Sequence, residues 1–284
     1  MNYETNIIFF GSSNYVIPII ETLNKNFKLF LTVTTEKSPT DSVIYYCHKN
    51  NIGYVSASSL SDSNLKSLIL NHKSSIGVLA DFGLLIPEKI LNAFPKGILN
   101  IHPSLLPKYR GPTPVQTAIL NGDKTTGISF IKLDNEIDHG GTLFQEKEEI
   151  LPQDSAQSLY SRLFKIGAKM LPEVINKYLD GSLKPKAQNH EKATYTKHLT
   201  RRDGYIDIAS PPNPEDLDKM IRGYYPWPGA WTEFKVQSSK FKVIKFLPEN
   251  KIQVEGKKPV SYKDFVNGYS EKGKEILEKI GIKY

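Results

Sequence analysis

Short apolar runs alternate with amphipathic segments along the first 150 residues of the chain. Five apolar runs are typical of buried strands and lie at 6–10, 28–34, 75–80, 97–102 and 127–133. The segments that predict helices between them lie at 13–23, 61–72 and 112–122. Because strands and helices alternate, the pattern predicts an α/β fold with a doubly wound, mostly parallel, Rossmann-like sheet.

The pattern changes in the second half of the chain. A partly exposed strand is predicted at 142–150, and a long amphipathic helix follows it up to Gly181. A polar, basic stretch without a sustained period then predicts a linker. Short β-type runs joined by tight turns indicate a smaller β-barrel domain of the OB type. The expected division into a larger domain, a basic linker and an OB-like domain is 1–182, 183–205 and 206–284.

The composition is ordinary for a globular chain of 284 residues, with 39% hydrophobic and 24% charged residues. No apolar stretch approaches the roughly 20 residues that span a bilayer, and the N-terminal segment lacks a leader pattern. The single cysteine, Cys47, excludes an intramolecular disulfide, and with His48 alone it falls short of a metal site. We therefore expect a cytoplasmic protein with no membrane partner and no metal.

The formal charge of +7 is unevenly distributed. Residues 1–181 hold 17 Lys and Arg against 17 Asp and Glu, and residues 182–284 hold the remaining 20 and 13 of the chain's 37 and 30. All of the net positive charge therefore lies in the last third, which predicts an anionic partner for the C-terminal part. A lysine-rich surface that only faces solvent is the alternative.

Two polar side chains mark the end of one predicted strand. In "ILNIHPSLLPKYRGPTPVQ", at 98–116, Asn100 and His102 share one strand face, and Pro103 ends the strand. Open α/β sheets bind their ligands at the carboxyl ends of strands, so this pair is a candidate site. The alternative is that loop backbone alone satisfies both side chains.

A carboxylate can join them from the next predicted strand, which runs into "LDNEIDHGG" with Asp134 and Asp138 as candidates. A carboxamide and an imidazolium can both donate to a developing oxyanion, and an aspartate can orient the imidazole. These residue types favour acyl transfer by direct attack. No Ser or Cys lies in a nucleophile elbow, and the glycine-rich fingerprints of NAD and NTP sites are absent from the sequence.

The octet "NIHPSLLP" at 100–107, followed by "DNEIDHGG", resembles the signature of the folate-dependent formyltransferases. The resemblance implies a catalytic trio of Asn100, His102 and Asp138, with 10-formyltetrahydrofolate as the formyl-donating co-substrate. The folate site that it implies is lined by Phe82, Gly83, Leu84, Leu85, Ile86, Ser104, Leu105, Leu106, Pro107 and Ile137.

The likeness runs along nearly the whole chain and favours one branch of that family. "FFGSSNYVIPIIETL", "KYRGPTPVQTAILNGDKTTGISFIKLD" and "MIRGYYPWPGAWTEF" follow the members that formylate the α-amino group of initiator methionyl-tRNA for translation initiation. This implies a monomer that holds tRNA by its linker and C-terminal domain. The implied substrate contacts are Tyr15, Arg110, Lys197, Arg201, Arg202 and Arg222. A nucleotide-sugar N-formyltransferase and a non-catalytic RNA-binding protein remain the alternatives.

Several positions depart from the family pattern. The segment 34–46 is short and holds one lysine, where the family has a long basic insertion. Glu136 and His139 stand where the family has Gly and Thr. Asp81 and Phe82 replace the usual Ala and Tyr. The C-terminal domain is also shorter than is typical of the family. This difference, the short segment and the residues Glu136 and His139 bear on how tRNA is bound more than on the chemistry.

Overall fold

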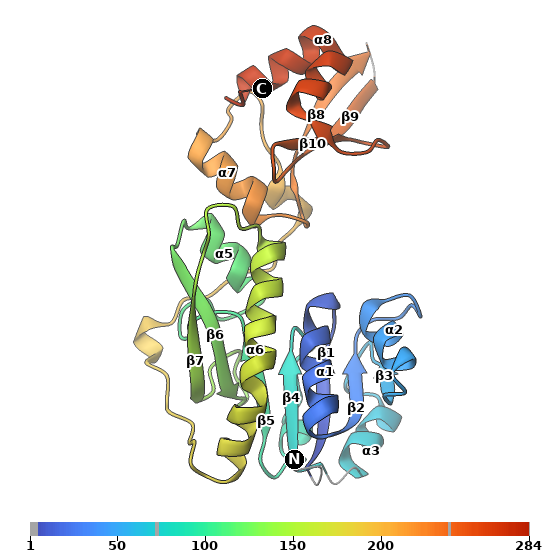
Figure 1. Cartoon of the computed structure of the whole chain (residues 1–284), viewed down its shortest axis with the longest axis vertical. Helices are drawn as coiled ribbons and strands as arrows, with labels where there is room; N and C mark the ends of the chain where they lie inside the picture. The colour runs from blue at the N-terminus through green and yellow to red at the C-terminus, as the bar shows by residue number, and fades with distance from the viewer. Residues whose placement is uncertain (1–4, 72–73, 238–239, 284) are drawn as a thin grey trace. The chain divides into compact units, whose positions relative to one another are not determined.

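A computed structural model describes residues 5–71, 74–237 and 240–283 (Figure 1). Contacts divide the chain into two compact units. The first comprises Met1–Pro114, Thr125–Glu148 and Tyr160–Thr196, and the second Val115–Lys124, Glu149–Leu159 and Lys197–Tyr284. The last boundary falls inside the predicted linker. His72, the final residue of a predicted helix, lies outside the described residues.

A seven-stranded sheet in the order β3-β2-β1-β4-β5-β6-β7 organises the N-terminal part of the chain (Figure 1). The first five strands of this order pair in parallel, whereas β6 pairs antiparallel with β5. This confirms the predicted α/β fold with its mostly parallel sheet. The strands are β1 (Asn6–Gly11), β2 (Lys28–Thr34), β3 (Tyr54–Ser56), β4 (Ile76–Ala80), β5 (Ile98–His102), β6 (Thr125–Lys132) and β7 (Thr142–Glu149).

Helices accompany these strands, and two contacts show which faces of β5 they cover. A Cβ on Gly167 of α6 would lie 3.1 Å from Ile101 Cγ2, so α6 packs on that face. Ile98 on the opposite face belongs to a core cluster with residues of α3 and α4. Asn100 and His102 alternate with Ile101 and therefore face away from α6. The helices are η1 (Asn14–Val16), α1 (Ile17–Asn26), α2 (Ser42–Lys49), α3 (Ser63–Asn71), α4 (Glu88–Leu91), α5 (Pro114–Leu120) and α6 (Ala156–Leu179).

The direction of β6 corrects one expectation about the candidate site. Because Leu99 pairs with Lys132 and His102 with Ser129, the carboxyl end of β6 lies at the amino end of β5. Asp138 therefore does not lie at an adjacent strand end on the shared edge. Neighbouring strands in sequence are usually neighbours in space, but that tendency does not fix their direction. The loop after β6 instead carries Asp138 back to β5.

Helix α2 occupies part of the segment 34–46, which the sequence analysis treated as a loop. Glu36 explains this helix, because its carboxylate accepts the backbone N–H groups of Val43 at 2.7 Å and Ile44 at 3.3 Å. A carboxylate at a helix N-terminus satisfies donors that have no partner within the helix. The remaining loop after β2 is therefore shorter than expected, and its only basic residue is Lys37.

The second unit contains a separate antiparallel sheet in the order β11-β10-β9-β8, which confirms the smaller β domain. One face of this sheet forms a core in which Phe246 and Ile252 pack with Phe265 of α8. The OB-type barrel stays a prediction. No helix among the described residues is long and apolar enough to cross a membrane. The elements are α7 (Pro214–Gly223), β8 (Ala230–Gln237), β9 (Lys240–Leu247), β10 (Lys251–Val254), β11 (Val260–Ser261) and α8 (Tyr262–Lys279).

The predicted linker contains two short 3-10 helices, η2 (His190–Lys192) and η3 (Arg201–Gly204). Its first part is bonded to the first unit through the backbone. Arg110 N–H donates to Thr194 O at 2.8 Å, and Thr196 N–H donates to Arg110 O at 2.7 Å. Isolated backbone hydrogen bonds of this kind leave no periodic pattern in the sequence. The sequence therefore predicts a linker here and not a segment that is bonded to the first unit.

Candidate active site

The Asp138 carboxylate is the centre of the polar cluster beside β5. It accepts Asn100 Nδ2–H at 3.0 Å and the backbone N–H of Gly111 at 2.7 Å. The oxygen that bonds Gly111 also lies 3.5 Å from His102 Nδ1. Asn100 and His102 are each only 5% exposed. The structure therefore brings together the three side chains named from the sequence, on the strand face that alternation predicts.

The two ring nitrogens of His102 have different surroundings. Nε2 lies 3.0 Å from the carbonyl oxygen of Tyr109, a group that can only accept, so Nε2 is the nitrogen that carries hydrogen. Nδ1 faces the Asp138 carboxylate at 3.5 Å, which is longer than an ordinary hydrogen bond. A proton that arrives between Nδ1 and the Asp138 carboxylate would be shared by these two groups. This arrangement suits a pair that takes up a proton during a reaction.

The loop after β5 adopts a backbone conformation that is rare for side-chain-bearing residues. Tyr109 has φ 64° and Gly111 has φ 106°. A Cβ on Gly111 would lie 2.8 Å from Thr196 Oγ1, so the close approach requires glycine. Thr194 Oγ1 accepts the Tyr109 N–H at 2.8 Å. The linker thereby positions both the carbonyl that faces the imidazole and the amide that bonds Asp138.

Gln188 holds the Asp138 loop from the other side. Its Nε2 donates to Asp138 O at 2.8 Å and to Gly140 O at 2.7 Å, and its Oε1 accepts Arg110 NH2 at 2.8 Å. Gln188 is buried, so these bonds are shielded from water. Sequence reasoning missed Gln188 because it lies in a polar stretch where no periodicity or motif distinguishes it.

Asp134, the second candidate carboxylate, is engaged elsewhere. Its Oδ2 lies 2.6 Å from His139 Nδ1, and its Oδ1 accepts the Glu136 N–H at 3.0 Å. Glu136 Oε1 also lies 3.8 Å from His139 Nε2. Glu136 and His139, which both differ from the family pattern, therefore form a local cluster with Asp134. Within the part of the chain that the structure describes, no group of three or more His, Cys, Asp or Glu is placed to hold a metal ion.

The residues predicted to contact folate include two exposed apolar side chains on loops. Leu85 is 76% exposed and Ile137 is 54% exposed, and such side chains often belong to contact surfaces. Ser104 is buried and donates to Lys108 O at 2.7 Å, which fixes the "SLLP" segment. The aromatic and aliphatic residues Phe82, Leu84 and Ile86 pack on the core cluster that contains Leu79 and Ile98. The assignment of these residues to a folate site stays a prediction.

Two predicted substrate contacts lie in the first unit. Tyr15 stacks on Tyr160 with ring centroids 5.3 Å apart. Arg110 is only 1% exposed, and its guanidinium donates to Gln188 Oε1 and Tyr195 OH. In the free protein Arg110 therefore braces the loop after β5 against the linker. Its place among the substrate contacts stays a prediction.

The other predicted contacts are basic residues of the second unit. Lys197 pairs with Asp203 at 2.8 Å, and Arg222 pairs with an aspartate one turn earlier in α7. Arg201 and Arg202 are exposed in η3. Arg201 and Arg202 are therefore better placed to bind an anion than Arg222, whose guanidinium already forms an ion pair with a carboxylate.

A carboxylate at the end of β4 has a more unusual setting than the sequence indicates. Asp81 has φ 47° and accepts Ser13 Oγ–H at 2.6 Å, and Ser13 itself has φ 74°. Neighbouring atoms desolvate the Asp81 carboxyl and raise its pKa above the ordinary value, although the bond from Ser13 lowers it. Strained residues of this kind gather at functional sites, and the ends of β1 and β4 lie at the same edge of the parallel sheet as the end of β5.

Comparisons with known proteins agree with this site. Residues 14–175 match the formyl transferase family model. The methionyl-tRNA formyltransferase of Chloroflexus aurantiacus is 34% identical over 242 residues, which cover 81% of this chain and 77% of the relative. That of Acetivibrio thermocellus is 33% identical over 252 residues, or 86% and 80% of the two chains.

Solved structures share the fold. The methionyl-tRNA formyltransferase from Clostridium thermocellum superposes with a TM-score of 0.61 at 18% identity, covering 90% of this chain and 99% of its own. A 4-N formyltransferase from Francisella tularensis gives 0.69 at 19% identity, covering 87% and 99%. The sheet, the cluster at β5 and the family match thus define a formyl-transferring enzyme. By its sequence relatives, the chain belongs to the methionyl-tRNA formyltransferase family.

Proposed function

We propose that the protein transfers the formyl group of 10-formyltetrahydrofolate to the α-amino group of methionyl-tRNA in the cytoplasm. The observation that carries the proposal is the Asp138 carboxylate, which bonds Asn100 and Gly111 and faces His102 at 3.5 Å. The identity to methionyl-tRNA formyltransferases over 81% of the chain supports the choice of acceptor. Direct transfer between two bound substrates needs no nucleophile from the protein.

The reaction forms one C–N bond and breaks another. The amine nitrogen attacks the formyl carbon, and the C=O electron pair moves onto oxygen. Asn100 uses one Nδ2 hydrogen for Asp138 and retains a second, which is suited to donate to the oxyanion. The tetrahedral intermediate then collapses as the bond from carbon to folate N10 breaks. One preorganised donor of this kind contributes a factor of about 10²–10³ in rate.

His102 and Asp138 together accept the proton that the amine loses and pass it to the leaving nitrogen. In the free protein both ring nitrogens face protein acceptors, because Nε2 bonds the Tyr109 carbonyl and Nδ1 faces Asp138. The proton from the attacking amine therefore goes to the Nδ1–carboxylate pair and is passed to folate N10 as that nitrogen leaves. Both this proton transfer and donation by the imidazolium to the oxyanion are expected from the residue types, and the contacts of the two ring nitrogens favour the proton transfer. General acid–base help contributes about 10²–10⁴ in rate.

The partner surfaces follow from exposure and charge. The exposed apolar side chains Leu85 and Ile137 are suited to cover the planar rings of folate. Residues 182–284 carry the net +7 and are suited to the tRNA backbone, so we assign domain 206–284 and the linker 183–205 to tRNA binding. The catalytic domain is then 1–182, with linker residues completing its site.

A formylation assay that offers methionyl-tRNA and an amino-sugar nucleotide side by side tests the proposal. With 10-formyltetrahydrofolate present, we expect methionyl-tRNA to be formylated and the amino-sugar nucleotide to be left unchanged. Preferential formylation of the sugar would instead support a sugar N-formyltransferase, which the short loop at Lys37 favours. Binding of tRNA without any transfer would support a non-catalytic RNA-binding protein.

A further inference from the structure

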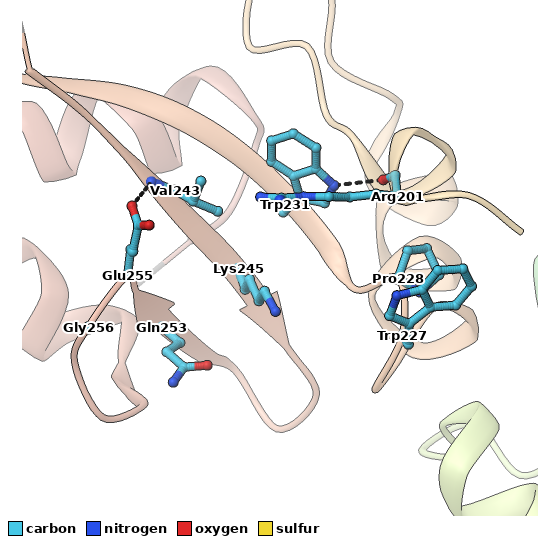
Figure 2. A pocket seen from close by; sticks show the side chains of 9 residues that line it. All are labelled: Arg201, Trp227, Pro228, Trp231, Val243, Lys245, Gln253, Glu255 and Gly256. Atoms are coloured by element: carbon cyan, nitrogen blue, oxygen red, sulfur yellow. Dashed lines mark hydrogen bonds between the residues drawn. The ribbon is translucent and has the colours of Figure 1, made fainter. Parts of the chain in front are cut away.

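A hollow of about 430 Å³ lies in the second unit, outside the catalytic cluster (Figure 2). Its size falls within the range of about 300–1,000 Å³ that small-ligand sites occupy. Strands β8, β9 and β10 contribute one side, and η3 and the segment before β8 contribute the other. The lining residues are Arg201, Trp227, Pro228, Trp231, Val243, Lys245, Gln253, Glu255 and Gly256.

The register of the small sheet places one row of functional side chains across the hollow. Trp231 pairs with Lys245 across β8 and β9, and Lys245 pairs with Gln253 across β9 and β10. Their strand neighbours Ile244 and Ile252 are buried in the core beneath. Because successive side chains of a strand point to opposite faces, the row lies on the outer face of the sheet.

Two flat aromatic surfaces border the hollow. The Arg201 guanidinium carbon lies 4.7 Å from the centre of the Trp231 ring, and the Trp231 indole N–H donates to Arg201 O at 2.8 Å. Trp227 lines the same hollow and is 56% exposed, so it contributes little to a core. Figure 2 shows Trp227 beside Pro228, apart from the stacked Arg201 and Trp231. Such surfaces accept another planar ring by stacking.

Arg201 and Lys245 place two cations at the hollow. Among the described residues, no carboxylate forms an ion pair with Arg201 or Lys245. Gln253 and Glu255 add an amide and a carboxylate, the groups that recognise the edges of bases. Gln253 Nε2 donates to Lys257 O at 3.0 Å and Glu255 Oε2 accepts the Val243 N–H at 3.3 Å, so a base edge would use the second amide hydrogen, the amide oxygen or the other carboxylate oxygen. Six other cations of this unit are in ion pairs, whereas Arg202 is like Arg201 and Lys245 in having none among the described residues; the six are Lys197, Lys219, Arg222, Lys251, Lys274 and Lys279.

We propose that this hollow binds one unpaired nucleotide of RNA. The base stacks between Trp227 and the Arg201–Trp231 pair, Lys245 contacts a phosphate, and Gln253 bonds the base edge. A nucleotide inside a stem cannot enter, because its base faces are already stacked on neighbours. The inference rests on the proposed tRNA substrate and adds a specific contact to the general attraction of a basic domain.

The hollow has a built-in probe, because Trp227 and Trp231 are the only tryptophans of the chain. Their fluorescence can be followed while the full-length protein is titrated with a single-stranded RNA hexamer, an RNA duplex of the same length or thymidine diphosphate. We expect the single strand to quench the fluorescence at concentrations where the duplex does not. Quenching by thymidine diphosphate without quenching by RNA, or equal quenching by single strand and duplex, would overturn the proposal.

Substitutions then tie the hollow to catalysis. We expect Trp227→Ala to raise the KM for methionyl-tRNA about 5- to 150-fold, the loss of one base stack. Lys245→Ala should weaken hexamer binding without removing a buried group. The matched control is Phe241→Ala. It also removes an exposed aromatic side chain of this unit, but Phe241 lies on β9 outside the hollow and is 58% exposed. Thermal unfolding of each variant shows that it is folded.

The outcomes separate this inference from the proposed function. If Trp227→Ala and Phe241→Ala have the same KM for methionyl-tRNA and the same hexamer affinity, the hollow is not an RNA site. If the wild type binds the hexamer through the hollow but leaves methionyl-tRNA unformylated, the RNA site stands and the proposed reaction is wrong.

Discussion

The residues that we propose as catalytic, Asn100, His102 and Asp138, are completed by backbone groups of the loop after β5. His102 Nε2 bonds the carbonyl of Tyr109, seven residues along the chain, and the Asp138 carboxylate accepts the backbone N–H of Gly111. The identities of Asn100, His102 and Asp138 could be predicted from the motif. The backbone groups that complete the cluster could not, because a carbonyl or an amide has no signature in the sequence.

The proton-transfer role predicts a kinetic effect at His102. We expect His102→Ala to lower kcat by about 10²–10⁴, the usual contribution of general acid–base help. The KM values should change little, because the imidazole acts mainly in the transition state. Asp134→Asn is the matched control, since Asp134 pairs with His139 away from β5, and it should keep kcat near that of the wild type. Steady-state kinetics with both variants would contradict the assignment if Asp134→Asn had the larger effect.

Backbone strain at Gly111 predicts a second effect. We expect Gly111→Ala to lower the free energy of unfolding by about 1–3 kcal/mol and to reduce kcat. Its φ of 106° is unfavourable for alanine, and the new Cβ would meet Thr196 Oγ1 at 2.8 Å. Gly83→Ala is the control for stability alone, because a Cβ there has no atom within 4 Å and Gly83 has no positive φ, although Gly83 is among the predicted folate contacts. Equal denaturant midpoints for the two variants would show that the close approach is unimportant.

At the scale of elements, hydrophobic periodicity predicted most helices beside the large sheet and all of its strands except β3, which has only three residues at the edge of the sheet. It failed where a tertiary contact decides the outcome. Helix α2 depends on Glu36, which caps it from the preceding loop, and a single carboxylate gives no periodic signal. The antiparallel direction of β6 likewise leaves its apolar run unchanged. Periodicity therefore reports which face is buried and not which way a strand runs.

The short helix η3 predicts a pH dependence of stability. Bonds from Lys197 and then Thr200 lower the pKa of Asp203 from 3.8 to about 2. A carboxyl whose pKa is lower in the folded state stabilises the fold above its unfolded pKa and loses that contribution as the pH falls toward 2. We expect Asp203→Asn to lower the melting temperature at pH 7 by about 2–4 °C, the shift for about 1 kcal/mol.

The same variant tests the direction in which the stabilisation by Asp203 changes with pH. Near pH 3 the difference between Asp203→Asn and the wild type should be smaller than at pH 7, because the unfolded chain, in which Asp203 has its ordinary pKa of 3.8, then binds a proton that the folded protein does not. Melting curves at the two pH values measure this difference. A difference that grows on acidification would contradict the assignment of the low pKa to Asp203.

For the whole molecule, we expect the charge distribution to decide which residues bind tRNA, and the ion pairs of the structure distinguish among the basic residues that composition alone treats as equal. Arg202 is exposed, and no carboxylate forms an ion pair with it among the described residues, whereas Lys197 is held by Asp203 at 2.8 Å. Lys37 is exposed but lies among residues 1–181, which carry no net formal charge. Equal formal charges are therefore expected to contribute unequally to tRNA affinity.

The salt dependence of tRNA binding measures this inequality. A cation that meets a phosphate releases about one counterion, so each such contact adds about one to the slope of log affinity against log salt concentration. We expect Arg202→Ala to reduce this slope by about one and Lys197→Ala by less, because Lys197 must first leave Asp203. Lys37→Ala should leave the slope near that of the wild type. Filter binding of methionyl-tRNA between about 50 and 200 mM salt gives the slopes. A larger reduction for Lys37→Ala than for Arg202→Ala would place the tRNA against the short loop after β2 and remove the C-terminal basic residues from the main contact.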